Sequence, residues 1–199
     1  MAGHGRWAQI RRRRNLSKLM RQPAPSARPL DPASLHVRYE GYGPAGVAVM
    51  LDCSTCDPQS LRGQLRRVFA EHGGQLGASG SIAYLFYEVG LLSFTAGTSP
   101  TLLGAAALDA GAEEVVTERD GSAEVLTDPR DLEVVRDALA HAGFESTEAA
   151  RTWRTATSVE LDRAHGAVVL RLLESLEGLD DVRGIYTNAA IPDEILESV

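Results

Sequence analysis

Tyr39-Glu-Gly-Tyr-Gly-Pro-Ala-Gly46 holds three glycines and one proline within eight residues. Glycine reaches positive φ without strain and proline fixes φ at about −65°, so this composition predicts a tight chain reversal. Leu35, Val37 and Tyr39 alternate with polar residues before the reversal, and an apolar run, residues 47–51, follows it. We therefore expect a β-hairpin that opens a mixed sheet. A turn of this composition is explained by structure alone and requires no ligand.

Regular helix and strand patterns follow the hairpin and continue to the C-terminus. A helix is expected over residues 58–72, with Asp57 as its N-cap and Gly73-Gly74 as its stop, because Leu61 and Leu65 recur at helical spacing. The other elements expected to pack with this helix are strands at residues 82–86 and 182–187 and a helix at residues 162–177.

A second set of patterns lies between these elements and has the order β-α-β-β-α-β, which is typical of a ferredoxin-like unit. Its expected elements are strand 89–94, a helix from Ser99-Pro100 to Gly111, strands 113–118 and 122–127 around a turn at Asp120-Gly121, a helix from Asp128-Pro129 to Gly143, and strand 145–153. We therefore predict an α+β fold of two α+β units, the second inserted into the first. The predicted parts are a basic arm and linker (1–34), a first unit (35–88 plus 154–199) and an inserted unit (89–153).

Charge is segregated along the chain. Residues 1–30 carry eight basic and no acidic side chains. The remaining 169 residues carry the other 12 of the 20 basic groups and all 27 acidic groups, a formal charge of −15. Such a body repels phosphate at long range, whereas the arm attracts it. Any contact with a polyanion must therefore be local, through the arm or a small patch.

The arm has the composition of a nucleic-acid contact, with cations for phosphates and an aromatic ring for stacking on bases. A short helical remnant within residues 3–22 is expected, followed by an extended linker interrupted by four prolines. The alternative is an unstructured basic tail that improves solubility. The candidate nucleic-acid-binding residues are His4, Arg6, Trp7, Arg11, Arg12, Arg13, Arg14, Lys18 and Arg21.

A second candidate patch comprises Arg62, Arg66 and Arg67 on the exposed side of the helix at residues 58–72. Arginines spaced in this way also occur on helix faces that contact only solvent, and that interpretation remains open.

Cys53-Ser-Thr-Cys56 is a Cys-x-x-Cys sequence at a strand-to-helix junction, where a thioredoxin-type site would lie. It is a single pair, and no second pair of Cys or His residues completes a zinc site. The five histidines show no ligand spacing either. We favour a buried thiol at Cys53 and an incidental Cys56, with no metal and no cofactor.

Two further patterns resemble ligand-binding or catalytic sites. The glycines between Gly73 and Gly80 suggest a phosphate-binding loop, but such loops precede a helix, whereas this one follows a helix and leads into a strand. The carboxylate pairs Glu113-Glu114, Asp180-Asp181 and Asp193-Glu194 are adjacent in sequence, so on strands they would point to opposite faces. They are expected to be solvated surface groups, and we predict neither an enzyme nor a small-molecule substrate.

Several segments resemble the YebC family, which includes the mitochondrial translational activator of cytochrome oxidase. The opening Met-Ala-Gly-His-Gly-Arg-Trp is similar to the family's Met-Ala-Gly-His-Ser-Lys-Trp. The other matching segments, in the family's order, are Tyr-Glu-Gly-Tyr-Gly-Pro at 39–44, Gly-Gly-Gln-Leu-Gly at 73–77, Gly-Ser-Ile-Ala-Tyr-Leu-Phe at 80–86 and Ala-Gly-Ala-Glu-Glu-Val at 110–115. The resemblance implies the same nested pair of units, preceded by a helical bundle of which this chain keeps only the opening residues.

The resemblance also implies a regulator of gene expression that binds nucleic acid, either DNA as a transcriptional regulator or ribosomal RNA as a translation factor. Three departures bear on that expectation. The helical bundle is truncated, and the family's Asn-Arg-Asn-Arg-Thr becomes Asp57-Pro-Gln-Ser-Leu61, which removes two arginines and adds an acid. The family's Gly-Pro-Gly-Gly becomes Gly43-Pro-Ala-Gly46.

The leading hypothesis is a non-enzymatic regulator whose arm contacts nucleic acid, DNA or ribosomal RNA, while its acidic body contacts protein. A ribosome or a protein is a possible partner. The alternative is a protein-interaction module that has lost nucleic-acid binding, and a redox role for the two cysteines ranks third. No apolar run approaches the roughly 20 residues of a membrane span. Residues 1–30 are arginine-rich like a mitochondrial transit peptide, but they match the family's mature start. We therefore expect a cytoplasmic protein.

Overall fold

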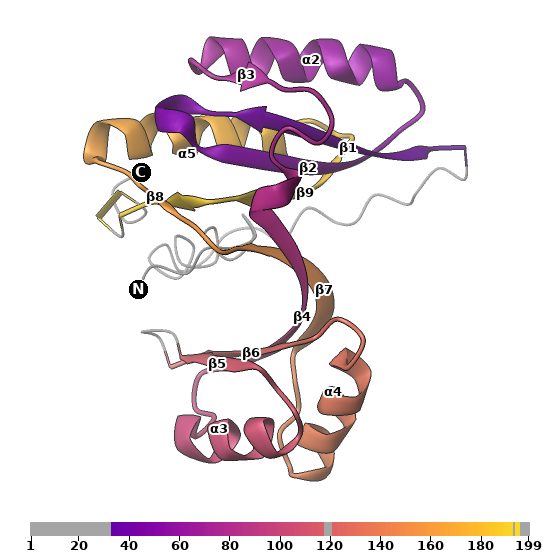
Figure 1. Ribbon diagram of the computed structural model, residues 1–199, viewed down its shortest axis with the longest axis vertical. Helices are drawn as coiled ribbons and strands as arrows, with labels where there is room; N and C mark the ends of the chain where they lie inside the picture. The colour runs from indigo at the N-terminus through magenta and orange to yellow at the C-terminus, as the bar shows by residue number, and fades with distance from the viewer. Residues whose placement is uncertain (1–32, 118–120, 193, 196–199) are drawn as a thin grey trace. The chain divides into compact units, whose positions relative to one another are not determined.

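The computed structural model describes residues 33–117, 121–192, 194 and 195. These residues form two compact units (Figure 1): Tyr87–Trp153 make one, and the segments before and after them make the other. We call the second of these the host unit and residues 87–153 the inserted unit. The predicted basic arm, its helical remnant and its proline-rich linker lie outside the described residues, as does Asp120 of a predicted turn.

The host unit begins with the predicted hairpin, which is confirmed. Strands β1 (Leu35–Tyr42) and β2 (Ala48–Thr55) pair in antiparallel register from Leu35↔Thr55 to Tyr42↔Ala48. A short 3₁₀ turn, η1 (Pro44–Gly46), joins them. Both Ala45, at φ 57°, and Gly46, at φ 77°, adopt positive φ. Among the described residues, Ala45 is the one non-glycine residue with a positive φ. This left-handed conformation costs a residue with a Cβ about 1–2 kcal/mol.

The hairpin lies within a sheet of order β3-β1-β2-β9, with β3 at Gln75–Leu76 and β9 at Val182–Thr187. Helices α2 (Pro58–Glu71) and α5 (Arg163–Glu177) both cover one face of it (Figure 1). Alternation along β2 sends Val49 and Leu51 into the core beneath these helices, and Met50 to the opposite face. The predicted helices at 58–72 and 162–177 are therefore confirmed to within a residue or two.

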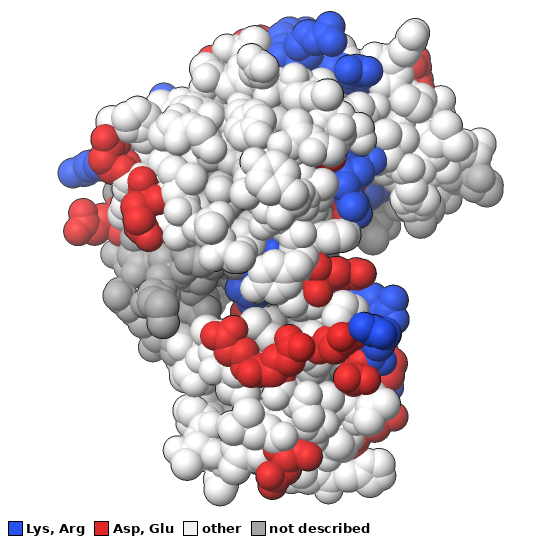
Figure 2. All heavy atoms as spheres, viewed as in Figure 1, with Lys and Arg blue, Asp and Glu red and all other residues white. Residues whose placement is uncertain are grey.

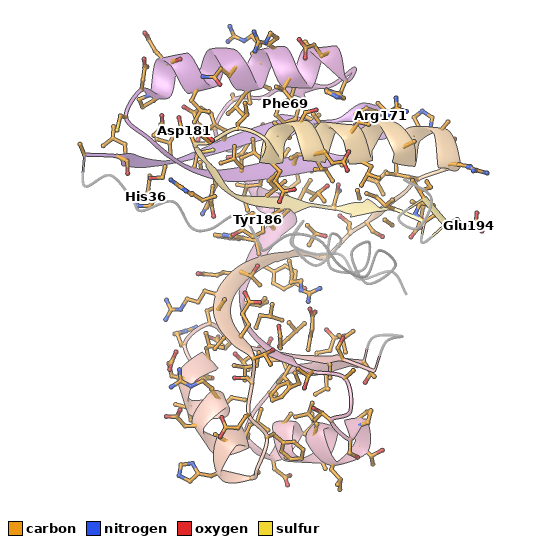
Figure 3. All side chains as sticks on the ribbon, turned by 180° about the vertical axis from the view of Figure 1, so that it is seen from behind. His36, Phe69, Arg171, Asp181, Tyr186 and Glu194 are labelled. Carbon is orange, nitrogen blue, oxygen red and sulfur yellow. The ribbon has the colours of Figure 1, made fainter. Side chains whose placement is uncertain are left out.

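Phe69 shows how closely α2 approaches the sheet. Its ring points from α2 toward the strands (Figure 3) and lies over Gly41 of β1. A Cβ on Gly41 would come within 2.7 Å of the ring, so this position requires glycine. Tyr186 of β9 lies on the other side of the sheet (Figure 3).

The inserted unit has the predicted β-α-β-β-α-β order. Its elements are β4 (Phe86–Phe94), α3 (Pro100–Asp109), β5 (Glu114–Thr117), β6 (Ala123–Thr127), α4 (Leu132–His141) and β7 (Glu148–Thr155). Its sheet has the order β5-β6-β4-β7, so the first and third strands are central, as in ferredoxin-like units. Residues Leu92, Val125 and Leu103 lie in one core beneath α3 and α4. The prediction of an α+β fold is confirmed.

Several details differ from the sequence prediction, including the short strand β3, which was not predicted. Residues 82–86 do not form a strand, because residues 83–85 form the 3₁₀ turn η2 (Ala83–Leu85) and β4 begins only at Phe86. Helix α4 begins at Leu132 rather than at Asp128, because the Asp128 carboxylate accepts the N–H of Arg130 at 2.8 Å and forms a separate turn. The parallel pair β8 (Val159–Glu160) and β10 (Ala189–Ala190) was not predicted.

The positive φ of Ala45 yields a prediction of stability. Ala45→Gly is expected to raise the free energy of unfolding of the host unit by about 0.5–1 kcal/mol, because relief of strain exceeds the entropic cost of glycine. Urea unfolding followed by circular dichroism measures the change. As a control, Ala70→Gly on the exposed side of α2 should lower the free energy by about 1 kcal/mol. If Ala45→Gly lowered the free energy of unfolding, the conclusion that the backbone of Ala45 is strained would be wrong.

Candidate nucleic-acid interface

Helix α2 presents three arginines to solvent because its apolar residues all face the sheet. The Asp57 carboxylate accepts the N–H of Ser60 at 3.0 Å, and Pro58 is the first helical residue, so the helix begins as predicted. The buried side chains of the helix are Leu61, Leu65, Val68 and Phe69.

Arg62, Arg66 and Arg67 are all exposed on the opposite side of α2. Figure 2 shows cationic side chains gathered over this helix, beside a largely uncharged area of the host unit. Arg67 lies 3.8 Å from Glu71, and both side chains are more than half exposed, so the pair is weak. Among the described residues, no acidic group lies within ion-pair distance of Arg62 or Arg66. Two arginines one helical turn apart are thus available to phosphates, and their role in binding stays a prediction.

The larger predicted site, the arm, lies outside the described residues. All of its members, from His4 to Arg21, belong to that part of the chain. Within the part of the chain that is described, the predicted patch on α2 is the part of the candidate site that has a structure.

The glycine-rich loop contains a cluster of backbone N–H groups, but a side chain of the protein itself fills it. The Glu40 carboxylate accepts the N–H of Gly80 at 2.7 Å with Oε1, and those of Ile82 at 2.7 Å and Ala83 at 3.0 Å with Oε2. Glu40 is only 5% exposed. These donors are the kind that bind phosphate in other proteins. The sequence argument against a phosphate loop therefore agrees with the structure, although Glu40 itself was not predicted.

Burial alone would raise the pKa of the Glu40 carboxyl. The three N–H donors and the nearby charge of Arg38 act in the other direction, and the pKa lies below its ordinary value. The carboxylate is therefore ionised at neutral pH and holds the loop between β3 and β4 on the sheet.

The two cysteines do not form a dithiol site. The Cys53 side chain lies in the core beneath the helices, where burial raises its pKa to about 12, with Asp52 and Asp181 acting in the same direction. Cys56 is exposed at the end of the strand, and neither cysteine is in a disulfide. A thiol with so high a pKa is a poor nucleophile, so the redox hypothesis loses its support.

The carboxylate pairs behave differently from one another. Glu113 and Glu114 are both exposed, as expected. Asp181, labelled in Figure 3, is only partly exposed, and its Oδ2 accepts the hydroxyl of Thr55 at 2.7 Å. The backbone carbonyl of Asp181 also accepts the N–H of Ser54, so this residue joins the end of β2 to the start of β9. The expectation of a solvated pair is therefore wrong for Asp181.

A polar hollow of about 590 Å³ opens beside Asp181 in the host unit. Its walls include Ser54, Cys56, Gln64 and Arg183. Over the described residues, no group of three or more His, Cys, Asp or Glu side chains is placed to hold a metal ion. None of the helices in that part of the chain is both long and apolar enough to cross a membrane.

The fold and sequence match known proteins. A family model described as "TACO1/YebC second and third domain" matches residues 35–189. Proteins called "Probable transcriptional regulatory protein" from Francisella tularensis subsp. tularensis (strain WY96-3418) and subsp. novicida (strain U112) are each 42% identical over 163 residues, covering 82% of this chain and 66% of theirs. The crystal structure of a conserved hypothetical protein from Aquifex aeolicus, Aq1575, matches with a TM-score of 0.76 and 37% identity, covering 82% of this chain and 68% of that one.

The chain is thus an α+β protein in which a ferredoxin-like unit interrupts a host unit. The chain belongs to the TACO1/YebC family, which confirms the resemblance found in the sequence. It spans 66% of the length of the Francisella relatives.

The Glu40 contact predicts a pH dependence of stability. Because the folded-state pKa is lower than the unfolded one, the carboxylate stabilises the fold fully above the unfolded pKa of about 4.3. This contribution is lost as the pH falls through the folded-state value. Glu40→Gln is expected to lower the free energy of unfolding at pH 7 by about 2 kcal/mol, and the difference from wild type should shrink below about pH 4. Urea unfolding at a series of pH values measures both effects.

Glu71→Gln serves as the control for this experiment, because Glu71 is exposed and forms only the weak pair with Arg67. It should change the free energy of unfolding by less than about 0.5 kcal/mol at any pH. A difference between Glu40→Gln and wild type that stayed constant from pH 7 to pH 3 would contradict the role assigned to the carboxylate.

Proposed function

We propose that the chain is a non-enzymatic, cytoplasmic regulator of gene expression that binds nucleic acid through its basic N-terminal arm. Its target is DNA, as for a transcriptional regulator, or ribosomal RNA, as for a translation factor. The observation that carries the proposal is the segregation of eight basic side chains into residues 1–30, ahead of a body with a formal charge of −15. The relatives' name, "Probable transcriptional regulatory protein", supports a regulatory role.

Helix α2 is the second contact in this proposal. Arg62 and Arg66 are exposed and one helical turn apart, so they can contact phosphates along one strand. The acidic surface of the body discourages contacts elsewhere and confines the nucleic acid to these cationic groups.

A second candidate function is a protein-interaction module without nucleic-acid binding. Asp57 favours this second function, because its carboxylate, which caps α2, places a negative charge beside the arginines of that helix. In that case the arm and α2 would contact a protein or the ribosome rather than nucleic acid.

Fluorescence anisotropy with labelled duplex DNA and structured RNA at several salt concentrations separates the two functions. If six to eight cations meet phosphates, the logarithm of the affinity should fall with the logarithm of the salt concentration with a slope of roughly −5 to −7. Replacing Arg11, Arg12, Arg13 and Arg14 together by alanine should reduce the magnitude of this slope by about 3 to 4. Sedimentation with ribosomes then distinguishes the translational from the transcriptional version.

Arg66→Ala tests the contribution of α2. The expected result is a several-fold loss of affinity and a slope reduced by about 1, because one phosphate contact is lost. Arg136→Ala is the matched control, since Arg136 is already paired with Glu133 at 2.5 Å and with Asp137 at 2.9 Å. Equal, negligible binding by wild type and by the variant with four alanines would refute nucleic-acid binding and leave the protein-interaction function.

A further inference from the structure

The loop that Glu40 holds carries an uncharged surface on an otherwise acidic body. Residues 73–87 contain no Asp, Glu, Lys or Arg. The Glu40 carboxylate beneath them is buried, and its oxygens accept three N–H groups. A polyanion can therefore approach this surface with less repulsion than it meets over the acidic parts of the body.

Tyr84 projects from this surface. It is 76% exposed, the highest value among the large apolar side chains of the described residues, ahead of Val134 at 67% and Leu102 at 64%. Its loop neighbours Ala78, Ser79, Gly80 and Ala83 are small and exposed, so they do not cover the ring.

The backbone that carries Tyr84 is fixed in place. Ala83, directly before it, donates its N–H to Glu40, and the N–H of Leu85, directly after it, bonds to the carbonyl of Ile82 at 2.9 Å. Ile82 is fully buried. Because the backbone of this turn is already ordered, the turn loses little conformational entropy when a partner stacks on the ring.

Tyr42 provides a second anchor for the loop. Its hydroxyl donates to the carbonyl of Ser81 at 2.9 Å. Burial raises the pKa of the Tyr42 hydroxyl, and Tyr84 acts in the same direction. The turn that carries Tyr84 is thus held by Glu40 and by Tyr42, while the Tyr84 side chain remains exposed.

We propose that Tyr84 is a stacking platform for an unpaired base of the bound nucleic acid. An exposed aromatic face in uncharged surroundings suits a base, which offers a flat π surface, whereas paired bases inside a duplex are not accessible to it. The inference rests on the proposed function and adds to it that the target contains a single-stranded segment, such as an RNA loop or an open DNA strand.

The test compares wild type, Tyr84→Ala and Tyr84→Phe by anisotropy with a labelled single-stranded oligonucleotide and with the matching blunt duplex. Tyr84→Ala should weaken binding of the single strand about tenfold and leave duplex binding within about twofold. Its salt slope should equal that of wild type, because no charge is removed. Tyr84→Phe keeps the ring and should stay within about threefold of wild type on both probes.

Leu102→Ala is the control, since Leu102 is an apolar side chain of similar exposure on α3. It should bind both probes like wild type, and urea unfolding checks that Tyr84→Ala is still folded. If Tyr84→Ala binds the single strand as tightly as wild type, or weakens both probes equally, the stacking role is overturned while the proposed function stands. A protein contact would then be the remaining use of the ring. Failure of wild type to bind either probe would overturn both proposals.

Discussion

The hydrogen bonds of the Glu40 carboxylate join strand β1 to the loop between β3 and β4 in the host unit. Glu40 lies on β1 opposite Met50, in a row that continues to Tyr186 on β9, and it accepts N–H groups from a loop about 40 residues later in the chain. Burying a carboxylate is costly unless donors replace the water that it loses, and here three backbone N–H groups do so. The same contact shapes the surface around Tyr84, so the anchoring of the fold and the exposure of the ring have one cause.

Much of this architecture follows from local patterns in the sequence. The glycines and proline of residues 39–46 predicted the hairpin, and the spacing of Leu61, Leu65 and Val68 predicted α2 together with the outward direction of its arginines. These predictions succeeded because the determinants, turn residues and helical periodicity, lie within a few positions of the structure that they specify. The order of the inserted unit could be predicted for the same reason, since glycines such as Gly111 and Gly143 end its helices.

What the sequence did not predict depends on contacts between distant residues. The apolar run 82–86 is compatible with a strand, but residues 83–85 form a 3₁₀ turn whose first N–H groups bond to the distant Glu40. Because residues 82–86 were predicted as a strand, Tyr84 was expected to be an ordinary strand residue and its exposure was not predicted. The short strands β3, β8 and β10 have two residues each, too few for any periodicity. Asp181 was predicted to be a solvated surface group because nothing in the sequence around it identifies Thr55, 126 positions earlier, as its partner.

The topology of the host sheet has a consequence for biosynthesis. Strand β2 occupies a central place, yet its neighbour β9 lies more than 130 positions later, as the pairing of Val49 with Thr187 shows. A ribosome translates the intervening residues at about 5–20 per second. During that time one edge of β2 has no hydrogen-bonding neighbour, and the apolar residues of the sheet that pack against α5 are exposed. The ferredoxin-like segment, whose strands pair over much shorter separations, can fold in that interval. Nascent chains of this protein should therefore depend on chaperones until their last helix and strand emerge.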